Sequence, residues 1–415
     1  MLKARLPDLG LEKVEDRRRR QGRRWRLPVL LRAVLVGLAS GRKSLAEVEQ
    51  LTDEMSQPIR EMLGISRRIA DTTLRDALVR LHPSELRAAI HRMMQAARRR
   101  KALVLQGFPF HVAALDGKAV PLSVWEHHYA QQHAHEETGV AYGLVRTVTA
   151  ALVSTLTKPI LDAVPIPAET NEMGIFPVAF EALMRAYGNL VRLVTYDAGV
   201  TSQAHCRLVV DAGKDFLFSI KNENWLVMQE AKRLLAAIPT GIAKAHTEDV
   251  LANGTTLHRY LFPCAVVGKS FFGWPQVKTI LRVHSERVRD GQVVASEDRY
   301  FISSLRVTEL TADQWLSLVR HHWAVEICHW TLDAIFREDE HPWIETDPRG
   351  ALVFMLLRRI AYNLLALFRS VTQRSDEQRA MPWRQLLRWL YNTLIAATRD
   401  QLLGLRSRPE VAVRS

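Results

Sequence analysis

Hydrophobic residues in the first quarter of the chain recur every three to four positions, which is the spacing of amphipathic helices. A dense apolar face runs over 27–38, and Ser44 with Glu47 forms the capping-box pattern that begins a helix. A short segment over 58–63 ends at a glycine, and a longer helical stretch follows over 66–82. This order resembles a helix-turn-helix, although a small helical bundle without DNA contact would have the same pattern.

After residue 107 the pattern changes to short apolar runs that are typical of buried strands. We expect strands at 111–115, 119–125 and 143–156, and then a helix at 171–187 and a strand at 190–196. A helix at 201–212, a strand at 215–221 and a helix at 224–237 follow. This is the element order of a ribonuclease H-like domain. The predicted fold class is therefore α/β, with an RNase H-like mixed sheet that is flanked by helices.

The next part of the chain alternates between apolar and polar residues and contains turn signals at 253–254 and 290–291, which predicts a β-rich insertion. Three helices are expected after it: a long one that Thr311 caps, and two apolar ones over 348–370 and 382–403. These patterns divide the chain into five parts. They are a helical, basic N-terminal domain (1–105), the first part of the RNase H-like core (106–238), the β-rich insertion (239–306), the core helix (307–345), and C-terminal helices with a basic tail (346–415).

Three carboxylates stand at informative places in this pattern. Asp116 ends the first predicted strand, Asp197 ends a later buried strand, and Glu326 lies on the long helix. An acid at the end of a buried strand loses hydration at a cost unless a cation neutralises it. A pair of divalent ions would neutralise three such acids and would activate a nucleophile for attack on phosphorus. The pattern therefore favours a two-metal site for phosphoryl transfer.

The charge of the chain favours a nucleic acid as the substrate. Among 415 residues there are 57 Lys and Arg against 44 Asp and Glu, and the pI is near 9.9. Such a surplus indicates a polyanionic partner. Arginines cluster at 17–20, 23–24 and 98–100. Each run alone could be a solvated helix end, but runs on both sides of one helical domain favour contact with DNA phosphates.

Other features indicate a cytoplasmic protein. The three cysteines have neither the spacing of a disulfide framework nor that of a zinc site. The first residues do not have the pattern of a signal peptide. We expect no apolar run of membrane length, because Arg32 interrupts one candidate and the pair Arg358 and Arg359 interrupts the other.

Several separated motifs carry a family resemblance. They are D-G-K at 116–118, T-N-E at 170–172, T-Y-D-A-G-V-T-S-Q at 195–203, S-I-K-N-E-N at 219–224, R-Y-F-I-S-S-L at 299–305, H-W-A-V-E at 322–326 and H-W-T-L-D-A-I-F-R-E-D at 329–339. In this order they resemble bacterial insertion-sequence transposases of the DDE type, in the branch that includes the H-repeat-associated proteins of the IS-four-like group. The chain departs from that pattern at Ile327, where the branch usually has Asn, and at Asp333, where the wider group has a basic residue.

The resemblance implies that Asp116, Asp197 and Glu326 are the catalytic and metal-binding residues and that they hold two Mg²⁺ ions, for which Mn²⁺ can substitute. Glu338 is the alternative third acid. The charge pattern and the resemblance together suggest DNA contacts at Arg17, Arg18, Arg19, Arg20, Arg23, Arg24, Lys118, Lys221, Asn222, Arg320, His329 and Trp330. Trp330 is either a platform for an unpaired base or a core residue, and Trp323 is expected to be a core anchor.

The implied activity is that of a DNA transposase, which cleaves the ends of a mobile element and joins the freed 3′-hydroxyl to target DNA. The implied partners are double-stranded DNA, both terminal inverted repeats and target, and a second copy of the chain in the DNA complex, with no membrane. The implied location is the bacterial cytoplasm, at the nucleoid. Two alternatives stay open: a non-catalytic, domesticated transposase-derived DNA-binding protein, and a structure-selective nuclease that cuts without joining.

Overall fold

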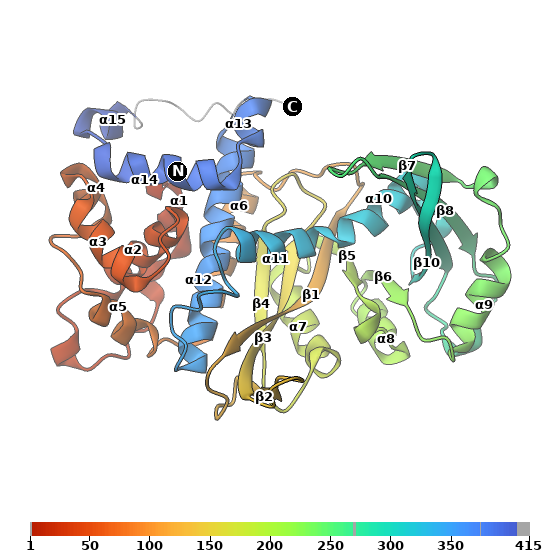
Figure 1. Cartoon of the computed structure of the whole chain (residues 1–415), viewed down its shortest axis with the longest axis horizontal. Helices are drawn as coiled ribbons and strands as arrows, with labels where there is room; N and C mark the ends of the chain where they lie inside the picture. The colour runs from red at the N-terminus through yellow and green to blue at the C-terminus, as the bar shows by residue number, and fades with distance from the viewer. Residues whose placement is uncertain (1, 269–270, 374, 405–415) are drawn as a thin grey trace.

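The computed structural model describes residues 2–268, 271–373 and 375–404, so the predicted basic tail over 405–415 lies outside the described residues. A helical part, a central sheet with its helices and a strand-rich end follow one another along the longest axis of the molecule (Figure 1). The C-terminal helices return to the helical part, where the backbone N–H of Ser56 donates to the carbonyl oxygen of Leu394 at 3.0 Å.

Helices form the first part of the chain, as predicted. They are α1 (Leu2–Arg5), α2 (Leu27–Ala39), α3 (Leu45–Glu54), α4 (Gln57–Leu63), α5 (Asp71–Leu78) and α6 (Pro83–Arg99). The side chain of Ser44 accepts a hydrogen bond from the Glu47 N–H at 3.1 Å and so caps α3. Gly64 ends α4 with a φ of 78°, a left-handed conformation that favours glycine.

The central sheet has the strand order of an RNase H-like domain. Its strands are β1 (His111–Leu122), β2 (Ala130–Ala134), β3 (Ala141–Leu152), β4 (Ile160–Ile166), β5 (Val191–Tyr196) and β6 (Asp215–Ile220). Strands β4, β3, β1, β5 and β6 lie side by side in that order; β3 is antiparallel to β1 and β4, whereas β1, β5 and β6 are parallel. Helix α7 (Glu172–Tyr187) connects β4 to β5, and α8 (Gln203–Asp211) connects the parallel strands β5 and β6. The predicted fold class is confirmed.

The individual strands differ from the prediction in three ways. Strand β2 was not predicted, because its residues are mostly polar. The runs at 111–115 and 119–125 belong to one strand, β1, which continues through Gly117. Strand β4 was not predicted, because Asp162 and Pro165 interrupt its apolar run. Asp162 is nevertheless buried in the sheet, since Arg87 and His91 of α6 pair with its carboxylate. A charge that an adjacent helix neutralises is not visible in the local pattern.

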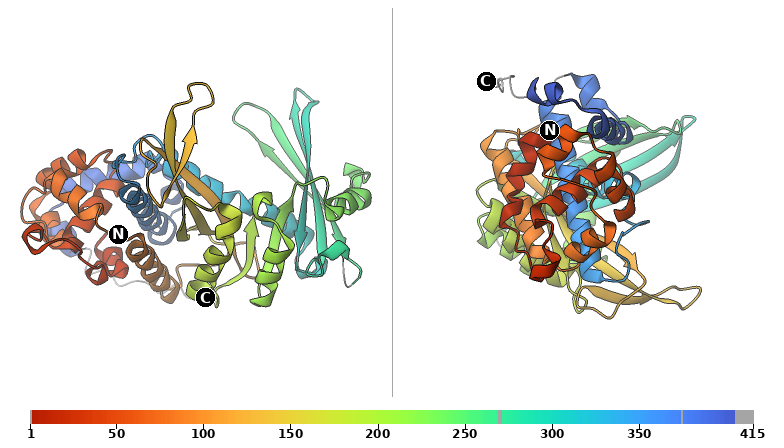
Figure 2. Two further views of the ribbon diagram at one scale, coloured as in Figure 1. Left: turned by 90° about the horizontal axis from the view of Figure 1, so that it is seen from below. Right: turned by 90° about the vertical axis from the view of Figure 1, so that its left-hand side faces the viewer.

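The predicted β-rich insertion is an extension of the same sheet. Helix α9 (Leu226–Leu235) precedes β7 (Ala245–Val250), β8 (Thr256–Ala265), β9 (Thr279–Arg289) and β10 (Gln292–Ser303). Strand β10 pairs with β6, so all strands of the chain's described part form one ten-stranded sheet. The hairpin β2–β3 and the outer ends of β7–β10 project to the same side of the molecule (Figure 2).

The long helix expected after Thr311 is present as two helices. Thr311 and Gln314 form a capping box at the start of α10 (Ala312–His322). The helix is interrupted at Trp323, and α11 (Ala324–Ala334) follows directly. These helices run across the strands of the central sheet and on toward the insertion (Figure 1). Glu326 therefore lies in the first turn of a new helix.

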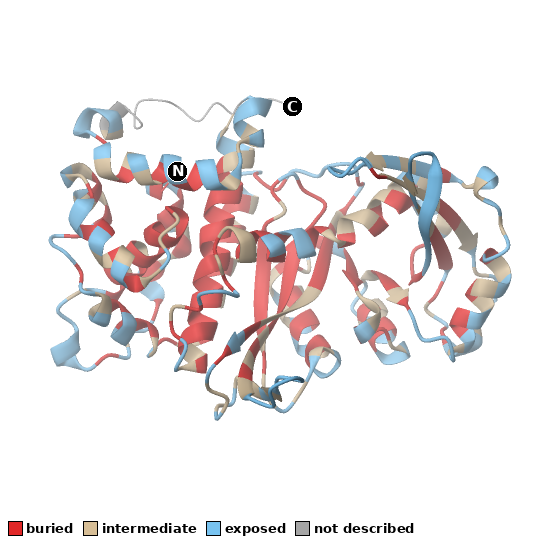
Figure 3. Cartoon of the chain, viewed as in Figure 1, coloured by how far each residue is buried: buried red, intermediate tan, exposed pale blue. Residues whose placement is uncertain are grey.

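Helix α12 (Pro348–Leu367) is the centre of the hydrophobic core and contacts α2 and α6 of the helical part as well as β3 and β4 (Figure 3). With the turn that follows it, over 348–372, it is long and apolar enough to cross a membrane, which corrects the expectation about apolar runs. In this structure its most apolar stretch is buried inside the protein. Arg358 and Arg359 are buried too, and Arg359 pairs with Glu338 at 2.8 Å.

Three helices complete the described chain: α13 (Asp376–Ala380), α14 (Trp383–Ala396) and α15 (Arg399–Gly404). Only α14 matches the long second helix that was expected over 382–403, because the chain bends between α14 and α15. Tyr391 of α14 donates to Glu54 of α3 at 3.0 Å. The C-terminal helices thus pack with the N-terminal ones, and the predicted boundaries at 105 and 346 separate segments that share one core.

Candidate active site

Two of the predicted acids lie at the same level of the chain segments that contain two neighbouring strands, β1 and β5. In the parallel pair of β1 and β5, Ala114 lies opposite Thr195. Two residues further along the same register are Asp116 and Asp197, and Asp197 directly follows the end of β5. Because the strands are parallel, both carboxylates emerge at the same edge of this part of the sheet, where ligand sites of open α/β sheets form.

Helix α11 brings the third acid to the same place. The ring nitrogen Nδ1 of His322, at the end of α10, lies 2.9 Å from the hydroxyl of Thr195 and so fixes the helix against β5. Burial raises the pKa of Glu326, and the negative charges of Asp116 and Asp197 raise it further. Glu326 therefore shares the electrostatic environment of the two aspartates.

Asp116 and Asp197 each have a basic partner in this structure. His329 Nδ1 lies 3.2 Å from the Asp116 carboxylate, and its buried Nε2 has no hydrogen-bond partner among the described residues. Asp197 accepts from the Ser219 hydroxyl at 3.0 Å and from Lys221 Nζ at 3.2 Å. Burial would raise the pKa of Asp197, but these contacts and the Ala198 N–H outweigh burial and lower it.

A fourth carboxylate, Glu172, belongs to this site although it was not predicted as a site residue. It is the first residue of α7, which Asn171 caps by accepting from the Gly174 N–H at 3.0 Å. Burial raises the pKa of Glu172, and the charges of Asp116 and Asp197 add to this effect. A Cβ at Gly117 would lie 1.9 Å from the Glu172 carboxylate, so the glycine after Asp116 makes room for it. The T-N-E motif was the available sequence signal.

The donor set suits divalent ions, but the side chains do not form a ready ligand cluster. In the described ranges, no three His, Cys, Asp or Glu side chains are grouped closely enough to hold a metal ion. The charges of Asp116 and Asp197 nevertheless help to raise the pKa of both Glu172 and Glu326, so negative charge is concentrated here. Carboxylate oxygens are the ligands that Mg²⁺ prefers. Asp116, Asp197, Glu326 and Glu172 are thus the residues that fit this ion chemically.

Lys118 does not offer a free cation to DNA, contrary to the prediction. Its Nζ lies 2.8 Å from Asp333 and 2.7 Å from Asp339, and only a tenth of its side chain is exposed. The pairing also accounts for Asp333, the residue that departs from the family pattern. An acid at this position holds Lys118 in place.

Glu338 is excluded as the alternative third acid. Its side chain is fully buried and is paired with Arg359 of the core helix α12. A buried ion pair of this kind has no access to a substrate. Of the two candidates for the third acid, Glu326 is the one that is exposed.

The other predicted contacts near the site differ in accessibility. Lys221 and Asn222 are exposed beside Asp197, and Trp330 is 61% exposed on the outer side of α11. His329 is buried and faces Asp116, so its position is that of a site residue and not of a surface contact. Arg320 pairs with Asp249 of β7 at 2.8 Å. Trp323, expected as a core anchor, is only partly buried.

The predicted N-terminal arginines also divide into two groups. Arg18 is buried and binds Asp16 and the carbonyl oxygen of Trp25, which corrects its assignment as a DNA contact. Arg17 pairs with Glu15, and Arg23 donates to backbone carbonyls. All the predicted arginines of this segment except Arg18 are exposed, including Arg19, Arg20 and Arg24. A groove beside them is lined by further basic residues, namely Arg67, Arg68 and Arg80.

Residues 10–94 match the sequence family described as DDE_Tnp_1-associated. The chain is also similar to the piggyBac transposase in a solved structure of its synaptic complex with hairpin DNA, at 12% identity and a TM-score of 0.45, over 99% of this chain and 79% of that one. No curated protein sequence matches. The family match relates the helical part of the chain to DDE transposases, and the bacterial insertion-sequence branch stays a prediction.

Proposed function

We propose that this protein is a DDE-type DNA transposase that uses divalent metal ions to cleave DNA at the ends of a mobile element and to join them to target DNA. The main support is the placement of Asp116 and Asp197 on neighbouring parallel strands, with Glu326 in the same electrostatic environment. The match of residues 10–94 to a family named for its association with DDE transposases is independent support.

The residues of the site would divide the work between them. Asp116, Asp197 and Glu326 would hold two Mg²⁺ ions, with Mn²⁺ as a substitute, and Glu172 would add a fourth oxygen donor. Such ions, when bound, activate water or a hydroxyl and stabilise a leaving oxygen. His329 orients Asp116, and the Lys221 ammonium beside Asp197 is exposed and available to a DNA phosphate.

The basic surfaces fit double-stranded DNA as the partner. Exposed arginines of the helical part lie near the groove lined by Arg67, Arg68 and Arg80, and Lys221, Asn222 and Trp330 are exposed near the acids. Target DNA would bind through backbone contacts, which are insensitive to sequence, and the same contacts would position the terminal repeats. We further propose a homodimer in the DNA complex, because two element ends must be joined, and a location at the bacterial nucleoid.

The direct test is DNA cleavage by variants of the three acids. Supercoiled plasmid is incubated with the full chain and Mg²⁺ or Mn²⁺, and nicked and linear products are measured. Asp116→Asn, Asp197→Asn and Glu326→Gln should each lower cleavage at least about a hundredfold, since each removes a charged ligand from the site. Asp211→Asn, at an exposed position of α8, is the control and should cleave as the original chain does. Equal cleavage by all four variants would refute the proposal.

A second function also calls for a test, because the acids are not grouped as ligands within the described part of this structure. The Lys221–Asp197 and His329–Asp116 pairs could be permanent, and the protein would then bind DNA without cutting it. Calorimetric titration with Mn²⁺ separates the two functions. Heat of binding that Asp197→Asn abolishes supports the transposase, whereas DNA binding without any metal binding supports the non-catalytic protein.

A further inference from the structure

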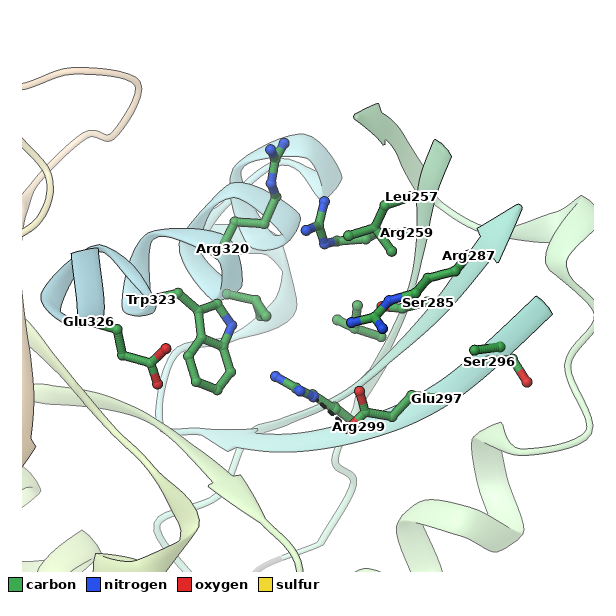
Figure 4. Close-up of a pocket in the computed structure, with 13 residues that line it drawn as sticks. Leu257, Arg259, Ser285, Arg287, Ser296, Glu297, Arg299, Arg320, Trp323 and Glu326 are labelled. Carbon is green, nitrogen blue, oxygen red and sulfur yellow. Dashed lines mark hydrogen bonds and ion pairs between the residues drawn. The ribbon is translucent and has the colours of Figure 1, made fainter. Parts of the chain in front are cut away.

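A groove lies between the insertion and helices α10 and α11, and it begins at Glu326 (Figure 4). Strands β8, β9 and β10 form one wall, and Arg320, Trp323 and Glu326 form the other. Its volume is about 410 Å³. The strand wall presents Arg259, Arg287 and Arg299, so four arginines line a space that opens at the candidate active site.

Carboxylates of the protein itself hold three of these four arginines. Asp249 of β7 binds both Arg259 and Arg320, with distances of 3.0 and 2.8 Å from Arg320 Nη2 to its two oxygens. Arg299 pairs with Glu297 at 2.8 Å, and its guanidinium also lies 4.7 Å from the ring centre of Trp323. Arg287 is exposed and has no ion pair within the described part of the chain.

A guanidinium binds carboxylate and phosphate oxygens with the same planar geometry. Asp249 therefore occupies a position between two arginines that a phosphate could take. The side chains of Asp249 and Arg320 are a little more than one-third exposed and that of Arg259 about one-quarter, so solvent reaches both ion pairs. Exposed ion pairs contribute little stability and exchange readily with other anions.

We propose that this groove binds the sugar-phosphate backbone of the DNA strand that enters the active site, and that Asp249 is an internal phosphate mimic which DNA displaces. This inference rests on the proposed function, because it assumes that DNA reaches Glu326. In the free protein Asp249 neutralises Arg259 and Arg320 and joins the insertion to α10. On binding, two DNA phosphates or one bridging phosphate replace its carboxylate.

The test measures binding of a labelled DNA duplex to the full chain by fluorescence anisotropy, with EDTA present so that no cleavage occurs. Asp249→Asn should bind about five- to tenfold more tightly, because DNA no longer competes with a carboxylate for two arginines. In the original chain, the Asp249 carboxylate that DNA displaces would take up a cation from solution, which offsets one cation released from the DNA. The Asp249→Asn variant takes up none, so the slope of log affinity against log salt should become steeper by about 1.

Glu230→Gln is the matched control, since it also removes one carboxylate and releases one arginine, Arg233, on the exposed surface of α9. It should change affinity less than about twofold. The double variant Arg259→Gln with Arg320→Gln should bind DNA about tenfold more weakly, and Asp249→Asn should add no gain in that background. Circular dichroism and melting confirm that each variant is folded.

The outcomes separate the inference from the proposed function. If Asp249→Asn binds no better than Glu230→Gln, the phosphate-mimic role is refuted while the proposed function stands. If the double arginine variant loses stability but keeps its DNA affinity, Asp249 is only a structural link and the inference is again refuted. If the original chain binds no DNA even at low salt, the proposed function fails and this inference fails with it.

Discussion

Asp162 and Asp116 lie on the same sheet but differ in the charges around them: Asp162 pairs with an arginine and a histidine, whereas Asp116 pairs with a histidine and lies among other acids. The carboxylate of Asp162 in β4 forms ion pairs with Arg87 and His91. Burial would raise the pKa of Asp162, but these partners outweigh burial and lower the pKa to about 2. Around Asp116, burial and neighbouring acids raise the pKa of both Glu172 and Glu326. The protein thus neutralises an acid that it uses for packing and leaves excess negative charge where we propose that cations bind.

The largest expected difference between the two regions is in stability. Asp162→Asn should lower the free energy of unfolding by about 3 kcal/mol, because it leaves the Arg87 guanidinium in a mostly buried site without its partner. Asp116→Asn should change it by less than about 1 kcal/mol, because it also relieves repulsion among the acids. Urea denaturation of both variants measures this. Equal losses would remove the distinction between a packing acid and a site acid.

The next effect concerns metal ions. Mg²⁺ at about a hundred times its dissociation constant should stabilise the folded chain by about 2.7 kcal/mol, because it binds the folded state alone. Glu326→Gln and Asp197→Asn should abolish this stabilisation by Mg²⁺, because each removes a proposed ligand. Asp162 is not a proposed ligand and has no part in the stabilisation. Differential scanning calorimetry with and without Mg²⁺ measures it. An undiminished gain in both variants would place the metal site elsewhere.

Gly117 offers a smaller and more local test. Gly117→Ala should lower the free energy of unfolding by about 1–2 kcal/mol, because the new Cβ would meet the Glu172 carboxylate. Gly199→Ala is the control, since nothing in the described chain lies within 4 Å of its new Cβ. In a Glu172→Ala background the loss at Gly117 should largely disappear. A loss that persists there would mean that Glu172 does not occupy the space beside Gly117.

The smallest effect is a pH dependence without metal. The folded state raises the pKa of Glu326 and Glu172 above their ordinary value of 4.5, so it binds protons more tightly than the unfolded chain does. These two groups therefore make the fold less stable as pH rises through and just above 4.5. Glu326→Gln should flatten this part of the stability profile in urea titrations. A steeper decline in the variant would contradict the raised pKa.

The helix ends and the strands that carry the acids could be predicted from the sequence, because each depends on residues only a few positions apart. Ser44, Thr311 and Gln314 cap helices where their spacing predicts it. Asp197 follows the end of β5 as predicted, whereas Asp116 lies inside the neighbouring strand β1 and not at its end. The sequence motif around Glu326 also predicted its helix, although the break at Trp323 was not foreseen.

Other features depend on partners distant in the chain and could not be predicted. Lys118 is held by acids more than two hundred residues away. Arg18 is different, because its partners Asp16 and the Trp25 carbonyl are close in the chain, but its arginine-rich surroundings do not indicate which arginine is buried. Strand β4 needs the cations of α6 before its Asp162 can be buried. Glu172 joins the site only because Gly117 lacks a side chain. Each of these requires the fold before the interaction can be recognised.

The most direct test of the central claim is a crystal structure of the protein grown or soaked with Mn²⁺, using the anomalous signal of the ion. We expect anomalous peaks in contact with the carboxylates of Asp116, Asp197 and Glu326, with the side chains of Lys221 and His329 adjusted around them. Occupied Mn²⁺ sites only at other places on the protein, with these carboxylates still paired to Lys221 and His329, would contradict it.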